Sequence, residues 1–156
     1  MNSINNIAQK YDVPVIYSTH PRTQKFIDSR GFKFDRRVRN LKPFGYLDYN
    51  KLQENALCVL SDSGTLSEES AMMDFPAVLI RTSTERPEVL DKGSVIIGGI
   101  KSDDVEQAVE MAISMRDNKE PYVEAEDYAD GNVSVKVIKI IQSYTKIVNE
   151  TVWLKH

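Results

Sequence analysis

The sequence predicts an α/β protein in which a Rossmann-like open parallel sheet is flanked by helices. Two observations support this prediction. Several short apolar runs rich in Val, Ile and Leu lack the alternation of a half-exposed strand, as is typical of parallel strands buried on both faces. Segments with helical spacing of apolar residues separate these runs, so strands and helices alternate along the chain. The 156 residues fit one domain, which we expect to span residues 1–156.

The expected strands are short and mostly β-branched. Pro14 stands at the first position of its run, where a missing N–H group does least harm, and Pro43 follows the weakest run. In chain order the expected strands are residues 13–17, 38–41, 57–60, 77–80 and 94–97.

The expected helices alternate with these strands, and two close the chain. Gly31 and Gly93 are expected to end helices, because glycine adopts the left-handed conformation found there. Asp48, and either Ser102 or Asp103, are expected to cap helices at their amino ends. In chain order the expected helices are residues 4–11, 23–31, 48–55, 65–73, 85–92, 103–115 and 132–149. The polar stretch of residues 117–130 is expected to be an exposed loop.

Composition excludes several classes of protein. The net charge of -3 arises from 20 basic and 23 acidic residues spread along the chain, so no basic stripe attracts nucleic acid. No apolar run approaches the length needed to span a bilayer, and residues 1–5 lack the features of a signal peptide. The single cysteine, Cys58, forms no internal disulfide. We therefore expect a cytoplasmic protein without nucleic-acid or membrane partners.

The segment from Ser61 to Glu69 is the most informative part of the chain. A buried strand ends there, a small polar turn with one glycine follows, and a helix begins. Free backbone N–H groups at such a helix start form an anion site. Ser63, Gly64 and Thr65 are small enough to approach a phosphate, and Glu69, further along the helix, is placed to accept from sugar hydroxyls. The alternative is that Ser61 or Ser63 only caps the helix.

A second polar cluster, residues 81–88, follows the next strand and is therefore expected at the same sheet edge. Arg81 and Arg86 are suited to offset phosphate charge, with Glu85 holding one of them. The alternative is a surface ion-pair cluster at a helix start, with Pro87 in the first turn.

Three further residues have ambiguous roles. His20 follows the first strand at the equivalent edge, but no second histidine or cysteine lies at metal-ligand spacing, so we predict no metal. Cys58 is expected to be an inert core thiol. Tyr49 fits either the core or a stacking platform for a base.

Several of these motifs together resemble one enzyme family. They are Ser18-Thr19-His20-Pro21-Arg22-Thr23, the segment from Pro43 to Tyr49, Ser61-Asp62-Ser63-Gly64-Thr65 with Glu68-Glu69, Phe75-Pro76-Ala77, and Thr84-Glu85-Arg86-Pro87-Glu88. Their order and spacing resemble the non-hydrolysing UDP-N-acetylglucosamine 2-epimerases over residues 4–141. That family has two Rossmann-like lobes in the glycosyltransferase B-type arrangement, and this chain resembles the carboxyl-terminal, UDP-binding lobe of a longer enzyme.

The resemblance implies roles for individual residues. The backbone of Ser63, Gly64 and Thr65 would hold the diphosphate, and Glu69 the ribose hydroxyls. Tyr49 would lie against the uracil, the backbone near Phe44 would read its edge, and Arg86 would bind near the phosphates. His20 and Glu68 are candidates for the substrate side. Thr65 replaces a frequent second glycine, and Phe44 replaces a polar side chain.

The implied reaction inverts C2 of a UDP-2-acetamido sugar by eliminating UDP and adding it back, without a cofactor. The catalytic groups would lie in the amino-terminal lobe, so this chain alone is expected to be inactive, and the full-length bacterial protein to be a homodimer. Residues 50–53, 61–65 and 143–153 resemble most the branch acting on UDP-2-acetamido-2,6-dideoxy-L-talose, which yields UDP-N-acetyl-L-fucosamine for capsule and O-antigen. Alternatives are a lobe of a glycosyltransferase with the same fold and a non-catalytic nucleotide-sugar sensor.

Overall fold

The structure is a computed structural model that describes residues 1–120, 126–129 and 131–155. The chain divides into two compact units, Met1–Ala125 and Glu126–His156, and each is described by itself. The prediction of one domain over residues 1–156 stays a prediction. Within the described ranges, no helix is long and apolar enough to cross a membrane.

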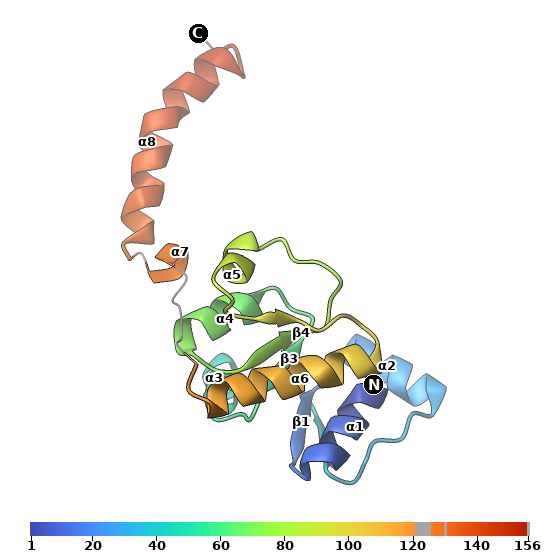
Figure 1. Cartoon of the computed structure of the whole chain (residues 1–156). Helices are drawn as coiled ribbons and strands as arrows, with labels where there is room; N and C mark the ends of the chain where they lie inside the picture. The colour runs from blue at the N-terminus through green and yellow to red at the C-terminus, as the bar shows by residue number, and fades with distance from the viewer. Residues whose placement is uncertain (121–125, 130, 156) are drawn as a thin grey trace. The chain divides into compact units, whose positions relative to one another are not determined.

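Parallel strands form the centre of the first unit. The strands are β1 (Val15–Ser18), β2 (Val38–Leu41), β3 (Val59–Ser61), β4 (Ala77–Leu79) and β5 (Ile96–Ile97). Their hydrogen bonds make two ladders, β1–β2 and β3–β4–β5, and every pairing is parallel. The predicted parallel α/β architecture is therefore confirmed (Figure 1).

Helices alternate with the strands in the first unit. They are α1 (Asn2–Tyr11), α2 (Pro21–Arg30), α3 (Tyr46–Glu54), α4 (Thr65–Met73), α5 (Pro87–Asp91) and α6 (Ser102–Asp117). The second unit contains α7 (Glu126–Ala129) and α8 (Val133–Thr151). The limits of α4 are those the sequence predicts.

The core of the first unit lies between β4 and the helices that cover it. Val78 of β4 packs with Val105 and Val109 of α6 and with Ile7 of α1, and α1 also packs on α6. Each such aliphatic side chain contributes about 1.5–3 kcal/mol when it leaves water. Figure 1 shows α6 running along these strands. Helix α4 also packs on β4, so the core fixes the position of the β3–α4 connection.

Helix ends were predicted less well than helix centres. Asp48 is not the cap of α3, because the helix begins at Tyr46 after Gly45; its carboxylate instead lies in the first turn, where the helix dipole favours it. Neither Ser102 nor Asp103 caps α6, because Lys101 is the residue before its first turn.

Glycine positions were predicted correctly. Gly31 ends α2 with φ 59°, and Gly93 follows α5 with φ 70°. The expected loop at residues 117–130 is partly wrong, since α6 continues to Asp117 and α7 covers Glu126–Ala129. Residues 121–125 and 130 of that prediction lie outside the described residues.

Candidate functional site

The turn between β3 and α4 is ordered by its own side chains. The hydroxyl of Ser61 accepts a hydrogen bond from the N–H of Ser63 at 3.0 Å, and the hydroxyls of Ser63 and Thr65 lie 2.8 Å apart. In the described part of the chain, no side chain caps α4, whose first turn follows Gly64. The capping alternative is therefore wrong. The N–H groups of Leu66 and Ser67 donate to the carbonyls of Ser63 and Gly64. Within the described residues no acceptor is seen for the N–H groups of Gly64 and Thr65, and such open N–H groups at a helix start bind anions.

Gly64 lies against the side chain of Arg86. A Cβ atom at Gly64 would come within 2.3 Å of Arg86 Nη1 and 3.0 Å of Arg86 Cζ. The backbone of Gly64 has φ −62° and ψ −28°, which any residue can adopt. Close approach of the guanidinium, and not backbone conformation, therefore favours glycine here, because a larger residue would displace the end of the Arg86 side chain. The approach brings a cation from the loop after β4 onto the helix start.

Two carboxylates hold Arg86 in this position. Its Nε donates to Glu68 Oε1 at 2.6 Å, and its Nη1 donates to Glu85 Oε1 at 2.9 Å. The hydrogen bond to Glu68, followed by the charges of both glutamates, raises the pKa of Arg86 above its usual value. These bonds use Nε and Nη1, and within the described residues no hydrogen bond from Nη2 is seen, so its two N–H donors face outward from the cluster for a ligand.

Glu85 also pairs with Arg81, whose Nη1 lies 2.9 Å from Glu85 Oε2. The ion-pair cluster expected as an alternative thus exists, with Pro87 beginning α5. It also orients Arg86 toward the β3–α4 turn. Glu68 and Glu85 balance the charges of the two arginines. Binding of an anion would therefore depend on hydrogen bonds from oriented N–H groups more than on a net positive charge.

A second group of side chains lies one turn into α4. Gln53 of α3 donates from Nε2 to Glu69 Oε2 at 2.7 Å. Burial, and after it the negative charge of Glu69, raises the pKa of Tyr49, so the phenol of Tyr49 is near that carboxylate. The predicted ribose and uracil residues are therefore neighbours, as a nucleoside requires.

His20 and Phe44 lie before other helices. His20 follows β1 and caps α2, accepting a hydrogen bond from the N–H of Arg22 at 3.2 Å through Nδ1. Phe44 is half-buried directly before Gly45, where α3 begins. In the described residues, no hydrogen bond or ion pair joins His20 to α4. The structure thus brings Arg86 to Gly64 and Tyr49 to Glu69, both on or next to α4. It does not bring His20 to these residues.

Gln53 is the residue that sequence reasoning missed. It lies four positions after Tyr49, so both project from one face of α3. This four-residue spacing was the sequence signal that could have identified Gln53 as a site residue. A polar residue at a position that helical periodicity assigns to the buried side of α3 needs a partner, and Glu69 is that partner.

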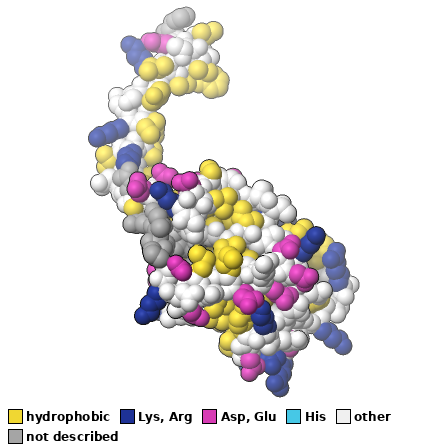
Figure 2. Space-filling view, in the orientation of Figure 1, with side chains coloured by type: hydrophobic (Ala, Val, Ile, Leu, Met, Phe, Trp, Pro, Cys, Tyr) yellow, Lys and Arg dark blue, Asp and Glu magenta, His cyan; other side chains and the backbone are white. Residues whose placement is uncertain are grey.

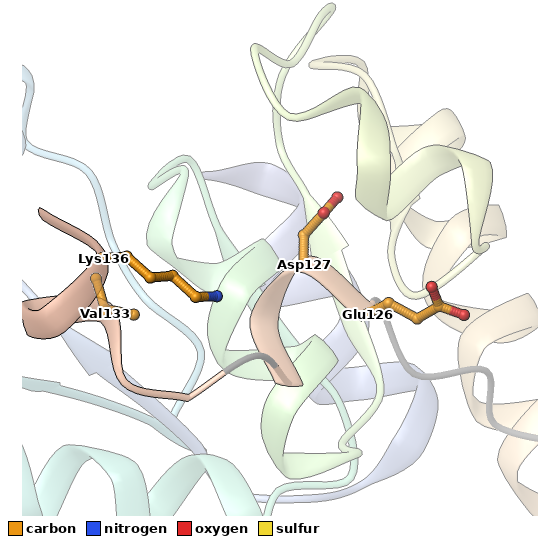
Figure 3. A pocket seen from close by; sticks show the side chains of 4 residues that line it. All are labelled: Glu126, Asp127, Val133 and Lys136. Carbon is orange, nitrogen blue, oxygen red and sulfur yellow. The ribbon is translucent and has the colours of Figure 1, made fainter. Parts of the chain in front are cut away.

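Other candidate sites take no part in this cluster. Cys58 is partly buried against the core, and burial raises its pKa to about 12, which agrees with the expectation of an inert thiol. No group of metal-binding side chains occurs among the described residues. Figure 3 shows a hollow in the second unit, lined by Glu126 and Asp127 of α7 and by Val133 and Lys136 of α8. None of the predicted site residues lines it.

Comparison with known proteins identifies the family. The sequence model of the UDP-N-acetylglucosamine 2-epimerases matches residues 1–142. The chain belongs to this family. A UDP-N-acetylglucosamine 2-epimerase of Methanococcus maripaludis is 34% identical over 146 residues, which are 90% of this chain and 38% of that protein. The chain therefore spans about two fifths of the length of this relative.

Solved structures of the family match the fold. The UDP-N-acetylglucosamine 2-epimerase of Rickettsia bellii shares 39% identity with a TM-score of 0.87, over 99% of this chain and 43% of that one. The Methanocaldococcus jannaschii enzyme, solved in complex with UDP-GlcNAc and UDP, shares 28% identity with a TM-score of 0.72, over 91% of this chain and 39% of that one. The predicted fold, a Rossmann-like lobe of the glycosyltransferase B type, is confirmed.

Proposed function

We propose that this chain is the carboxyl-terminal, UDP-binding lobe of an enzyme that inverts C2 of a UDP-2-acetamido sugar. Family membership supports the reaction class, and a relative solved with UDP-GlcNAc and UDP supports the ligand class. The observation that favours this site most is the contact of Arg86 with Gly64 at the uncapped start of α4.

The spacing of the site suits a nucleoside diphosphate. The diphosphate would lie on the N–H groups of Gly64 and Thr65, beside the Nη2 side of Arg86. The N–H group of Ser63 would join them by exchanging the Ser61 hydroxyl for a phosphate oxygen. Thr65 and Glu69 are four residues apart on one face of α4, a rise of about 6 Å. That separation fits a phosphate at the helix start and a ribose at Glu69. Tyr49, next to Glu69, would then lie against the uracil, and the backbone at Phe44 would contact its edge.

The chemical task of this lobe would be to stabilise the leaving group. Elimination across C1–C2 develops negative charge on UDP, and the UDP must stay bound until it adds back to the glycal. Prearranged N–H groups and a fixed guanidinium stabilise such charge without reorganising. Glu68 orients Arg86 through the 2.6 Å bond and, with His20, would lie on the substrate side. Proton transfer at C2 would need groups outside this chain.

The finer assignment is to the branch acting on UDP-2-acetamido-2,6-dideoxy-L-talose, in a cytoplasmic pathway that supplies capsule or O-antigen precursors. The motifs at residues 50–53 and 61–65 support it. The complete protein would be a homodimer, and this chain alone would bind UDP weakly without turnover.

Calorimetry with UDP tests the site directly. Glu69→Ala and Arg86→Ala are expected to weaken binding about tenfold each, because each removes a hydrogen bond to or from a charged group. Glu110→Ala is the matched control, since Glu110 forms an exposed ion pair with Lys10 on α1 and α6. Unchanged affinity in both site variants would exclude this location. For the complete enzyme, product analysis distinguishes epimerisation from transfer to an acceptor.

A further inference from the structure

Gln53 is an unusual choice for the packed side of a helix. The residue is 2% exposed, and its Nε2 donates to Glu69 Oε2 at 2.7 Å. Its Oε1 is shielded from solvent and lacks a hydrogen-bond partner within the described residues. Burying an amide with an unmet acceptor is unfavourable. An apolar side chain would be buried at this position of α3 without that penalty, so packing alone does not account for Gln53.

The bond to Glu69 also defines how the amide is oriented. A carboxylate only accepts hydrogen bonds, so the NH2 group of Gln53 must face it and the carbonyl must point away. The unmet Oε1 is therefore a consequence of holding Glu69. With Oε2 engaged, Glu69 keeps Oε1 for another donor. A glutamate held in one rotamer loses less conformational entropy when a ligand binds.

The surroundings of Glu69 agree with a prearranged acceptor. Tyr49 precedes Gln53 by one helical turn on the same face of α3, and the charge of Glu69 contributes to the raised pKa of Tyr49. Helix α3 thus supplies two polar neighbours to one carboxylate of α4. The hydrogen bond from Gln53 restricts the carboxylate and leaves a defined direction for a ligand.

We propose that Gln53 is a positioning residue that presents Glu69 to the ribose hydroxyls and so makes the site select ribonucleotides. The inference rests on the proposed function, because it takes Glu69 as the ribose acceptor. A ribose offers two vicinal hydroxyl donors, and a deoxyribose offers one. A fixed carboxylate discriminates between them better than a mobile one, because only the fixed acceptor is already oriented toward both donors.

The test compares the affinities of this chain for UDP and 2′-deoxy-UDP by calorimetry. Gln53→Met keeps the volume and removes the donor. It is expected to reduce the preference for UDP about tenfold, or about 1.4 kcal/mol, while affinity for 2′-deoxy-UDP stays nearly constant. Gln24→Met, in which a half-buried glutamine of α2 loses its bonds to Asp28 and Asn40, is the control and should keep the preference. An equal loss for both nucleotides, or an unchanged preference, would overturn the role of Gln53.

Gln53→Glu gives a readout that a packing role would not produce. Near neutral pH the introduced carboxylate repels Glu69, whereas at lower pH the pair of carboxyl groups retains a proton and the introduced one can donate it in a hydrogen bond. The UDP preference of Gln53→Glu should therefore rise as pH falls, and a pH-independent preference would count against the proposal.

Glu69→Ala separates the role of Gln53 from the proposed function. If this variant keeps the UDP preference, the ribose assignment itself fails. If it abolishes the preference while Gln53→Met retains it, only the role of Gln53 fails.

Discussion

Gly64→Ala is expected to disrupt the site through a single added atom. The new Cβ would lie 2.3 Å from Arg86 Nη1 and 3.0 Å from Glu85 Oε1. Non-bonded atoms pack at about 3.5 Å, so Nη1 must move by about 1 Å. A shift of that size away from Glu85 would stretch their hydrogen bond, now 2.9 Å, beyond the hydrogen-bond range. The backbone would not suffer, because φ is −62°.

Displacement of the guanidinium should lower the affinity for UDP about tenfold, the effect of losing one hydrogen bond to a charged group. Calorimetry measures it, with a thermal unfolding curve to show that the fold persists. Gly131→Ala is a matched control: Gly131 also lies just before a helix, in the second unit, and a Cβ there would meet no described atom within 4 Å.

A double variant isolates the cause. If Gly64→Ala acts through Arg86, adding it to Arg86→Ala should cost little more than Arg86→Ala alone. Full additivity of the two effects, or UDP binding by Gly64→Ala as tight as in the unaltered chain, would refute the argument from steric contact.

Three other predictions concern the chain outside the site. Hydrogen bonding, first from the N–H of Arg37, lowers the pKa of Asp35 from 3.8 to about 2. The resulting stability is present above about pH 4 and lost as pH falls through 2, so Asp35→Asn should flatten this acid dependence in thermal unfolding. Cys58, with a pKa of about 12, should resist alkylation at pH near 8 in the folded state; rapid labelling would contradict its burial. Helix α8 has an apolar stripe and no buried residue among those described (Figure 2), so Ile140→Lys should reduce self-association in light scattering; a chain already monomeric at high concentration would contradict this.

The strand–helix alternation and the start of α4 could be predicted from the sequence because both depend on local chemistry. Short β-branched runs favour buried parallel strands, and the small residues around Gly64 favour a tight turn into a helix. The predicted caps at Asp48 and at Ser102 or Asp103 were wrong because local chemistry alone does not decide where a helix begins. Several polar residues near a helix start can cap it, and tertiary packing decides which residue begins the helix.

The contacts of the site depended on the fold. The sequence predicts that Arg86 and Glu69 lie at one sheet edge, but not that Arg86 lies on Gly64 or that Gln53 bonds to Glu69. Those contacts join α3, α4 and the loop after β4, which are separate in sequence. Tertiary packing brings these elements together, and no local sequence pattern specifies how far apart their side chains lie.

The most direct test of the central claim is the effect of UDP on the backbone amides of the β3–α4 turn. In heteronuclear NMR spectra of the isotope-labelled chain, UDP should shift the N–H signals of Gly64 and Thr65 strongly, and those of α6 near Glu110 little. Binding that perturbs α6 and leaves Gly64 and Thr65 unchanged, or no binding at millimolar UDP, would contradict the assignment of this turn as the diphosphate site.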